Sequence, residues 1–191
     1  MPAVEIDKRI LKEDYCNFDL IARSWNDEYR GRVWKNKVRI ADFEGTDLDE
    51  IMAELRTIVD DIQHKKRVKR GRRKPTPREI ADAIAAVESK LSRTQKMMLA
   101  IHCKSLNLRL NMRAISRVGD YATPEVAFAD YAQMAHRIAD ELAYVPGSRR
   151  KDVYQGVTVL FNDEVAVGSV NADTTLTLRP EIARALEILK W

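Results

Sequence analysis

Apolar and polar residues alternate in three short stretches near the start of the chain, after a charged leader. The stretches are FDLIARSW (residues 18–25), EYRGRVW (28–34) and KVRIADFEG (37–45). Alternation with a period of two is typical of strands with one buried face, and the residues around Asn26-Asp27 and Asn36 favour turns between them. The pattern therefore predicts a small three-stranded antiparallel meander.

The apolar spacing then changes to steps of three and four residues. Thr46 is the predicted N-cap of a helix, with Asp49 at the capping-box position and Asp47 and Glu50 adding negative charge to the first turn. The apolar positions form one stripe on a helix of about five turns, and they are Leu48, Ile51, Met52, Leu55, Ile58, Val59 and Ile62. A helix packed on the meander would give an acidic α+β domain over residues 1–64.

Two tryptophans belong to the predicted meander. We interpret Trp25 and Trp34 as large core or edge residues of the small domain. Base stacking is the alternative for Trp34, because it lies between Arg32 and Lys35 and would offer a flat ring beside cations.

The sequence after residue 75 contains several signals for the start of a helix. Complete capping boxes are predicted at Thr76, with Glu79 three residues later and Pro77 between them, and at Ser92, with Gln95. Three further helix starts carry a capping side chain or a proline at the first helical position: Asn111, Thr123-Pro124 and Arg179-Pro180.

Short strands are predicted between and after these helices. SLNLRLN (105–111) has alternating leucines, and VTVLF (157–161) and EVAVGSV (164–170) flank Asn162-Asp163 as a β-hairpin, with TLTL (175–178) as a further strand. The order of helix, short strand, helix, longer helix and hairpin is that of a winged helix-turn-helix. We therefore expect an α+β protein with a helical, winged-helix-like domain over residues 76–191. A helical scaffold that binds no nucleic acid is the alternative.

Positive charge is concentrated between the two predicted domains. KKRVKRGRRK (residues 65–74) contains eight Lys or Arg and no acid. Removing these eight from the 33 basic residues of the chain leaves 25 against 29 acidic ones, so the basic character is local. A polycation of this density attracts phosphate backbones with little regard to base sequence. We predict a basic linker over residues 65–75, and a solvated linker without a ligand is the alternative interpretation.

The sequence contains few groups for catalysis. It has three histidines, His64, His102 and His136, without a metal-ligand spacing, and it has neither a glycine-rich phosphate loop nor a GxSxG motif. His102 and Cys103 are adjacent on a predicted helix, so their side chains diverge and are a poor nucleophile and base. We therefore expect a non-enzymatic protein without catalytic residues, metal or cofactor.

Electrostatic contacts with phosphate are the chemistry that remains. Outside the basic run, positive side chains gather before and within the short helix after residue 111, and again ahead of the predicted hairpin. The predicted nucleic-acid-binding residues are Lys65, Lys66, Arg67, Lys69, Arg70, Arg72, Arg73, Lys74, Lys104, Arg109, Arg113, Arg117, Arg149, Arg150 and Lys151.

Two stretches resemble known families. GTDLDEIMAEL after the strands is similar to HicB-like antitoxin domains, in which a Gly-Thr turn opens a helix after a meander. LSRTQKMMLAIH, GDYATPEVAFADYAQMAHRIADEL and LRPEIARALEILKW resemble a C-terminal module of bacterial HNH-type and restriction-associated proteins, over residues 91–191. Asp120 and Asp130 depart from that pattern, by interrupting a Gly-Tyr pair and by replacing an expected asparagine. The resemblance implies an association with DNA-targeting systems and transfers no catalytic residue.

These observations favour a non-enzymatic protein of a bacterial or phage system that binds nucleic acid, most directly duplex DNA, through phosphate contacts. Its acidic domain, residues 1–64, would contact a protein partner, and a homodimer is a further candidate because helix-turn-helix proteins often pair. The alternative is a protein-interaction subunit or inhibitor in a defence or counter-defence assembly. Binding of RNA or a single strand by the meander is a third. The chain has no apolar run of about 18 residues and no secretory leader, so we expect a cytoplasmic protein without membrane contact.

Overall fold

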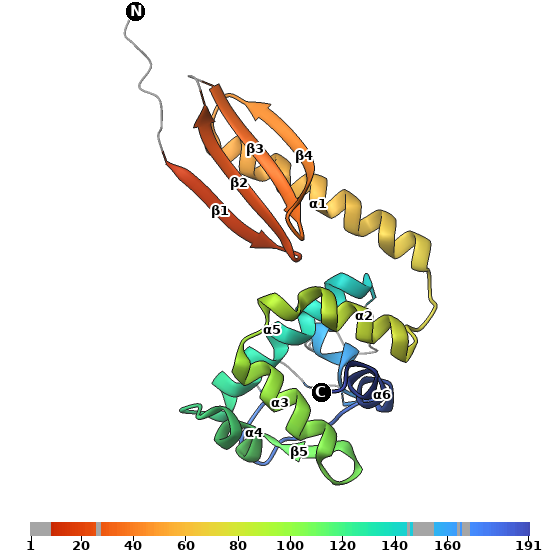
Figure 1. The fold of residues 1–191 in the computed structure, drawn as a ribbon. Coiled ribbons are helices and arrows are strands. Elements are labelled where there is room, and N and C mark those ends of the chain that lie inside the picture. Colours follow the sequence, from red (N-terminus) through yellow and green to blue (C-terminus); the bar gives the residue numbers. More distant parts are fainter. Residues whose placement is uncertain (1–8, 26–27, 145, 147–154, 164, 166–168) are drawn as a thin grey trace, which may run out of the picture. The chain divides into compact units, whose positions relative to one another are not determined.

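The computed structural model is an α+β protein whose sheet and helices are shown in Figure 1. It describes residues 9–25, 28–144, 146, 155–163, 165 and 169–191. The chain divides into two compact units, Met1–Gly71 and Arg72–Trp191. Each unit has its own hydrophobic core. No helix in the described residues is long and apolar enough to cross a membrane.

Unit 1 contains a four-stranded antiparallel sheet. Its strands are β1 (Ile10–Tyr15), β2 (Phe18–Trp25), β3 (Glu28–Lys35) and β4 (Val38–Gly45), hydrogen-bonded in this order. The prediction of three strands missed β1. No residue of β1 is fully buried, and polar side chains occur on both of its faces, so this edge strand has no clear apolar alternation.

Tight turns connect these strands. Cys16-Asn17 and Asn36-Lys37 form two-residue loops in which both residues have positive φ, between 49° and 66°. Positive φ at both central positions is the type I′ conformation, whose twist matches that of the flanking strands. The turn predicted around Asn36 is confirmed. Asn26-Asp27 lies outside the described residues.

Helix α1 (Leu48–Arg70) covers one face of this sheet, as Figure 1 shows. Its N-cap is Asp47 and not the predicted Thr46, because the Asp47 carboxylate accepts a hydrogen bond from the Glu50 amide at 2.8 Å. The Thr46 hydroxyl instead donates to the Glu50 carboxylate at 2.6 Å. The helix comes very close to the sheet at Gly31, where an added Cβ would lie 2.3 Å from Cγ2 of Ile51.

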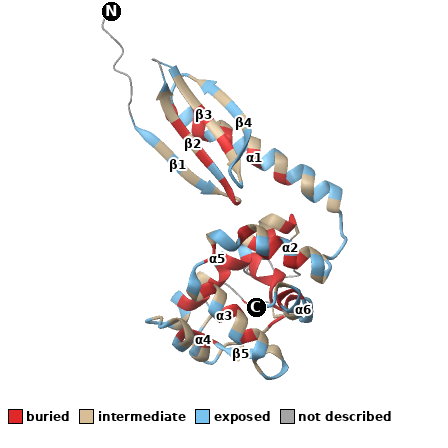
Figure 2. Cartoon of the chain, viewed as in Figure 1, coloured by how far each residue is buried: buried red, intermediate tan, exposed pale blue. Residues whose placement is uncertain are grey.

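The same helix continues well beyond its buried stripe. It has 23 residues, and residues 65–70, predicted as part of a linker, are helical. Lys and Arg are good helix formers, and cations near a helix C-terminus interact favourably with its dipole, so a basic sequence can prolong the helix. Figure 2 shows that this last part of α1 is exposed or only partly buried. Gly71, with φ of 60°, ends it.

The α-helices of unit 2 begin at the predicted signals, and they are α2 (Pro77–Val87), α3 (Arg93–Lys104), α4 (Met112–Gly119), α5 (Pro124–Leu142) and α6 (Pro180–Leu189). The 3₁₀ helices η1 (Glu88–Lys90) and η2 (Leu106–Leu108) were not predicted, and η2 occupies part of the stretch 105–111 that was expected to be a strand. Both capping boxes, at Thr76 and Ser92, are present. Gln95 also donates to the Asp130 carboxylate at 2.8 Å and so joins α3 to α5.

The predicted wing is not confirmed. Residues 157–159, expected in a strand, belong to the 3₁₀ helix η3 (Gln155–Val159). A short buried apolar run is compatible with a strand or a helix, so its periodicity does not decide between them. β6 (Thr175–Thr177) is a strand as predicted, but it pairs with β5 (Arg109–Asn111). Much of the other predicted arm, at residues 164 and 166–168, lies outside the described part of the chain.

Candidate nucleic-acid interface

The basic segment, residues 65–74, is divided between the end of α1 and the extended chain after Gly71. Its Lys65, Arg67, Lys69, Arg72 and Lys74 side chains belong to exposed residues. None of these five forms an ion pair with a carboxylate of the described residues. They are therefore available to an external anion.

Other cations of the segment have partners within the protein. Arg73 pairs with Glu79 at 2.6 Å, and Glu79 also completes the capping box of α2. The Lys66 ammonium lies 5.7 Å from the centroid of the Phe18 ring. Arg70 is half-buried. Carboxylates of the described residues thus compensate only part of the segment's charge.

Two lysines that are not among the predicted phosphate-binding residues, Lys35 and Lys37, extend this positive region. The Lys35 ammonium lies 4.6 Å from the centroid of the same Phe18 ring that Lys66 approaches, so the ends of β3 and α1 lie close together. Lys37 follows in the exposed turn after β3. The residues around Asn36 predicted the turn, but the approach of Lys35 to α1 depends on how the helix packs on the sheet.

Unit 2 has its own group of predicted cations around α4. Lys104 ends α3, Arg109 begins β5, and Arg113 and Arg117 lie one turn apart on α4. All four are exposed. Arg113 pairs with Asp173 at 3.1 Å, which reduces its availability to phosphate. The remaining predicted cations, Arg149, Arg150 and Lys151, lie outside the described residues.

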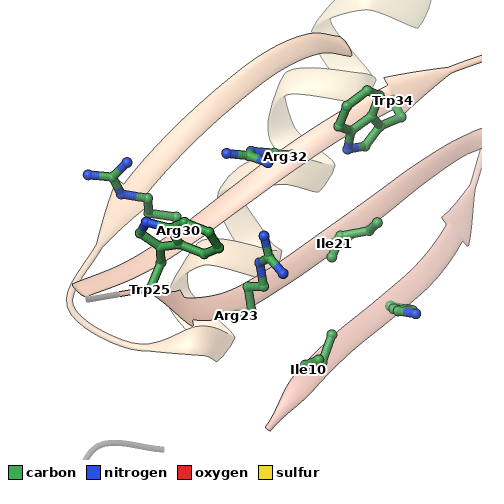
Figure 3. A pocket seen from close by; sticks show the side chains of 8 residues that line it. Ile10, Ile21, Arg23, Trp25, Arg30, Arg32 and Trp34 are labelled. Carbon is green, nitrogen blue, oxygen red and sulfur yellow. The ribbon is translucent and has the colours of Figure 1, made fainter. Parts of the chain in front are cut away.

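A second surface with exposed cations lies on the face of the sheet opposite α1. It has a hollow of about 280 Å³, shown in Figure 3. We call this surface the open face, and the residues that line its hollow are Ile10, Lys12, Ile21, Arg23, Trp25, Arg30, Arg32 and Trp34. They come from alternate positions of β1, β2 and β3, because successive side chains of a strand point to opposite faces.

The tryptophans of the open face are not core residues. Trp25 is 48% exposed and Trp34 is half-buried. Of the two alternatives given for Trp25, core or edge residue, this exposure excludes the core. The alternation FDLIARSW places Phe18, Leu20 and Ala22 against α1, and it thereby directs Asp19, Ile21, Arg23 and Trp25 away from the helix.

Ion pairs neutralise one side of the open face. Arg30 pairs with Glu28 at 2.8 Å and with Glu44 at 3.3 Å, and these carboxylates raise its pKa. Arg32 pairs with Asp42 at 3.2 Å. On the other side, the Arg23 guanidinium lies 4.7 Å from the centroid of the Trp25 ring and has no carboxylate partner in the described residues. Lys12 has none there either.

His102 and Cys103 of α3 pack in or against the hydrophobic core of unit 2. His102 is fully buried: one ring nitrogen, Nδ1, lies 3.0 Å from the Tyr131 hydroxyl, and the other, Nε2, lies 3.1 Å from the Leu176 carbonyl oxygen. Burial lowers the pKa of His102 and raises that of Cys103 to about 12. Within the described residues, no group of three His, Cys, Asp or Glu side chains could hold a metal ion.

No family model matches the chain, and no curated protein or solved structure matches it. The resemblances to HicB-like domains and to the HNH-associated module stay predictions.

Proposed function

We propose that the protein is a non-enzymatic nucleic-acid-binding protein that holds duplex DNA through the phosphate contacts of its basic segment. The observation that carries this proposal is the set of five exposed cations, Lys65, Arg67, Lys69, Arg72 and Lys74, without carboxylate partners in the described residues. Three of them, Lys65, Arg67 and Lys69, span about 6 Å along the axis of α1, at a rise of about 1.5 Å per residue. A charge density of this kind favours a polyanion over a single acidic side chain.

Counterion release would supply most of the binding free energy. Duplex DNA has about one charge per 1.7 Å of axis, and each neutralised phosphate releases condensed cations. If the five side chains each contact one phosphate, the logarithm of the association constant should fall with the logarithm of salt concentration at a slope of about −4.5. Such contacts position a protein on DNA without reading its sequence.

The cations around α4 are candidates for additional phosphate contacts. Lys104, Arg109 and Arg117 are exposed and have no ion pair within the described residues. A winged helix-turn-helix mode of binding for unit 2 stays a prediction, and so does a bacterial or phage setting. The competing proposal, a protein-interaction subunit in a defence or counter-defence assembly, would use the same basic segment to bind an acidic partner.

The test is the affinity of the full chain for a duplex DNA at 0.1 M salt, measured by fluorescence anisotropy. The variant replaces Lys65, Arg67 and Lys69 with glutamine. A matched control replaces Arg93, Arg184 and Lys190, which removes the same charge elsewhere. Losing three phosphate contacts should weaken binding by about two to three orders of magnitude, whereas the control should lose much less.

Equal losses in the two variants would mean that net charge, and not the basic segment, determines binding. No binding by the parent chain even at low salt would overturn the proposal and favour the acidic protein partner. Circular dichroism of both variants checks that α1 remains helical.

A further inference from the structure

We infer that the open face of the sheet is a binding site for single-stranded nucleic acid, whose bases stack on Trp34 and Trp25. This inference goes beyond the proposed function, because it concerns another surface and another form of nucleic acid. It also stands without the basic segment, since its residues come from β1, β2 and β3. Figure 3 shows the two rings on the same face, with arginines between them.

The first argument is the exposure of apolar and aromatic surface on this face. Trp25 is 48% exposed and Ile10 is 56% exposed, beside a hollow of about 280 Å³. The opposite face of the same sheet packs against α1, with Leu20 and Val33 fully buried. The lining of the hollow combines aromatic rings with cations and contains no acid. This combination suits single strands, because every base has a face that can stack.

The second argument is the arrangement of charge. Arg23 and Arg30 lie directly opposite each other on β2 and β3, an arrangement that destabilises a sheet when no anion is present. Glu28 and Glu44 neutralise Arg30, but Arg23 and Lys12 have no described carboxylate partner. An anionic backbone would therefore contact Lys12 and Arg23 and avoid the acids of β4. Asp14 and Asp19 lie on the same side near Trp34, so the backbone would also turn away from that end.

The register of the strands sets the length of the site. Trp34 lies opposite Asp19 and Trp25 opposite Glu28, so the two tryptophans are separated by six residues along β2. At about 3.4 Å per residue this is about 20 Å, enough for several nucleotides. The Arg23 guanidinium already lies over the Trp25 ring, and arginine planes also stack on bases.

A single strand fits these features better than a duplex. Base pairs in a duplex present only their edges in the grooves, whereas their faces are covered by neighbouring pairs. Rings on a sheet surface with a hollow between them need unstacked bases. Duplex binding at this face is therefore an outcome that the test must distinguish.

The test is quenching of tryptophan fluorescence by an oligothymidylate of about 12 nucleotides, compared with a hairpin duplex. The protein is the full chain in which Lys65, Arg67 and Lys69 are glutamine, so that failure of the basic segment does not affect the result. We expect quenching by the single strand and little by the duplex. Trp34→Leu and Trp25→Leu should each weaken binding about tenfold. Trp191→Phe, in unit 2, is the matched control and should leave the affinity unchanged.

Arg23→Gln provides a variant that keeps both rings. It should weaken the oligothymidylate complex and reduce its salt dependence by about one unit of slope. Absence of quenching in this triple-glutamine protein, equal quenching by the duplex, or loss of quenching only with Trp191→Phe would each overturn the inference. Binding of duplex to the parent through residues 65–74 is scored separately, so the two proposals can fail independently.

Discussion

The buried histidine of unit 2 makes the stability of the protein sensitive to mild acid. His102 is fully buried, and its ring stacks on Phe161 with centroids 5.7 Å apart. One tautomer satisfies both ring nitrogens, with Nδ1 accepting from the Tyr131 hydroxyl and Nε2 donating to the Leu176 carbonyl. Desolvation is the main cause of its lowered pKa, opposed by the hydrogen bond to Leu176 and the charge of Asp163.

The sign and size of the effect follow from linkage. An unfolded chain binds a proton at His102 near pH 6.5, whereas the folded protein binds it only at lower pH. The stability contributed by the neutral ring is therefore fully present above about pH 6.5 and decreases as the pH falls below it. One proton gives a slope of at most about 1.4 kcal/mol per pH unit, so the loss between pH 6.5 and 5 is at most about 2 kcal/mol.

Urea unfolding at several pH values measures this contribution. Trp25→Phe and Trp34→Phe leave Trp191, which packs beside the core of unit 2, as the fluorescent reporter. In this background, His102→Gln removes the titrating ring, and His136→Gln replaces an exposed histidine of the same unit. The free energy of unfolding should fall less steeply from pH 6.5 to 5 in His102→Gln than in the parent or in His136→Gln. Equal slopes in all three proteins would refute the reasoning.

Two other predictions concern packing and thiol chemistry. Gly31→Ala should lower the free energy of unfolding of unit 1 by about 1–3 kcal/mol, because the new methyl group would overlap Ile51. Urea unfolding followed by Trp25 and Trp34 fluorescence measures it, and an unchanged midpoint would contradict the close packing of α1 on β3. The thiol of Cys103 should react slowly with a disulfide reagent at pH 8 and rapidly in urea, because burial raises its pKa to about 12. Rapid reaction of Cys103 in the folded protein, located by peptide mapping, would disprove it.

Local signals predicted the helix starts well. Thr76 with Glu79 and Ser92 with Gln95 form the predicted capping boxes, and Asn111 and Thr123 cap as expected. These signals depend on residues three positions apart, so tertiary structure has little influence on them. The exception is Thr46, because the neighbouring Asp47 offers a competing carboxylate for the same helix end.

Features that depend on distant contacts were predicted less well. The pairing of β5 with β6 joins Leu110 to Leu176, and nothing in either short stretch specifies the other. The buried run at residues 157–161 carried no periodicity that separates a strand from a helix. For the interface, the charge of residues 65–74 was evident in the sequence. The hollow of the open face was not, because it requires the register that brings Arg23 opposite Arg30.

The salt dependence of duplex DNA binding is the most direct measurement of the central claim, that the cations of the basic segment bind phosphate. Association constants for the parent chain, measured between about 0.05 and 0.2 M salt, should give a logarithmic slope of about −4.5. Replacing Lys65, Arg67 and Lys69 with glutamine should reduce the slope by about three units. A slope near zero for the parent, or the same slope in the variant, would contradict the account.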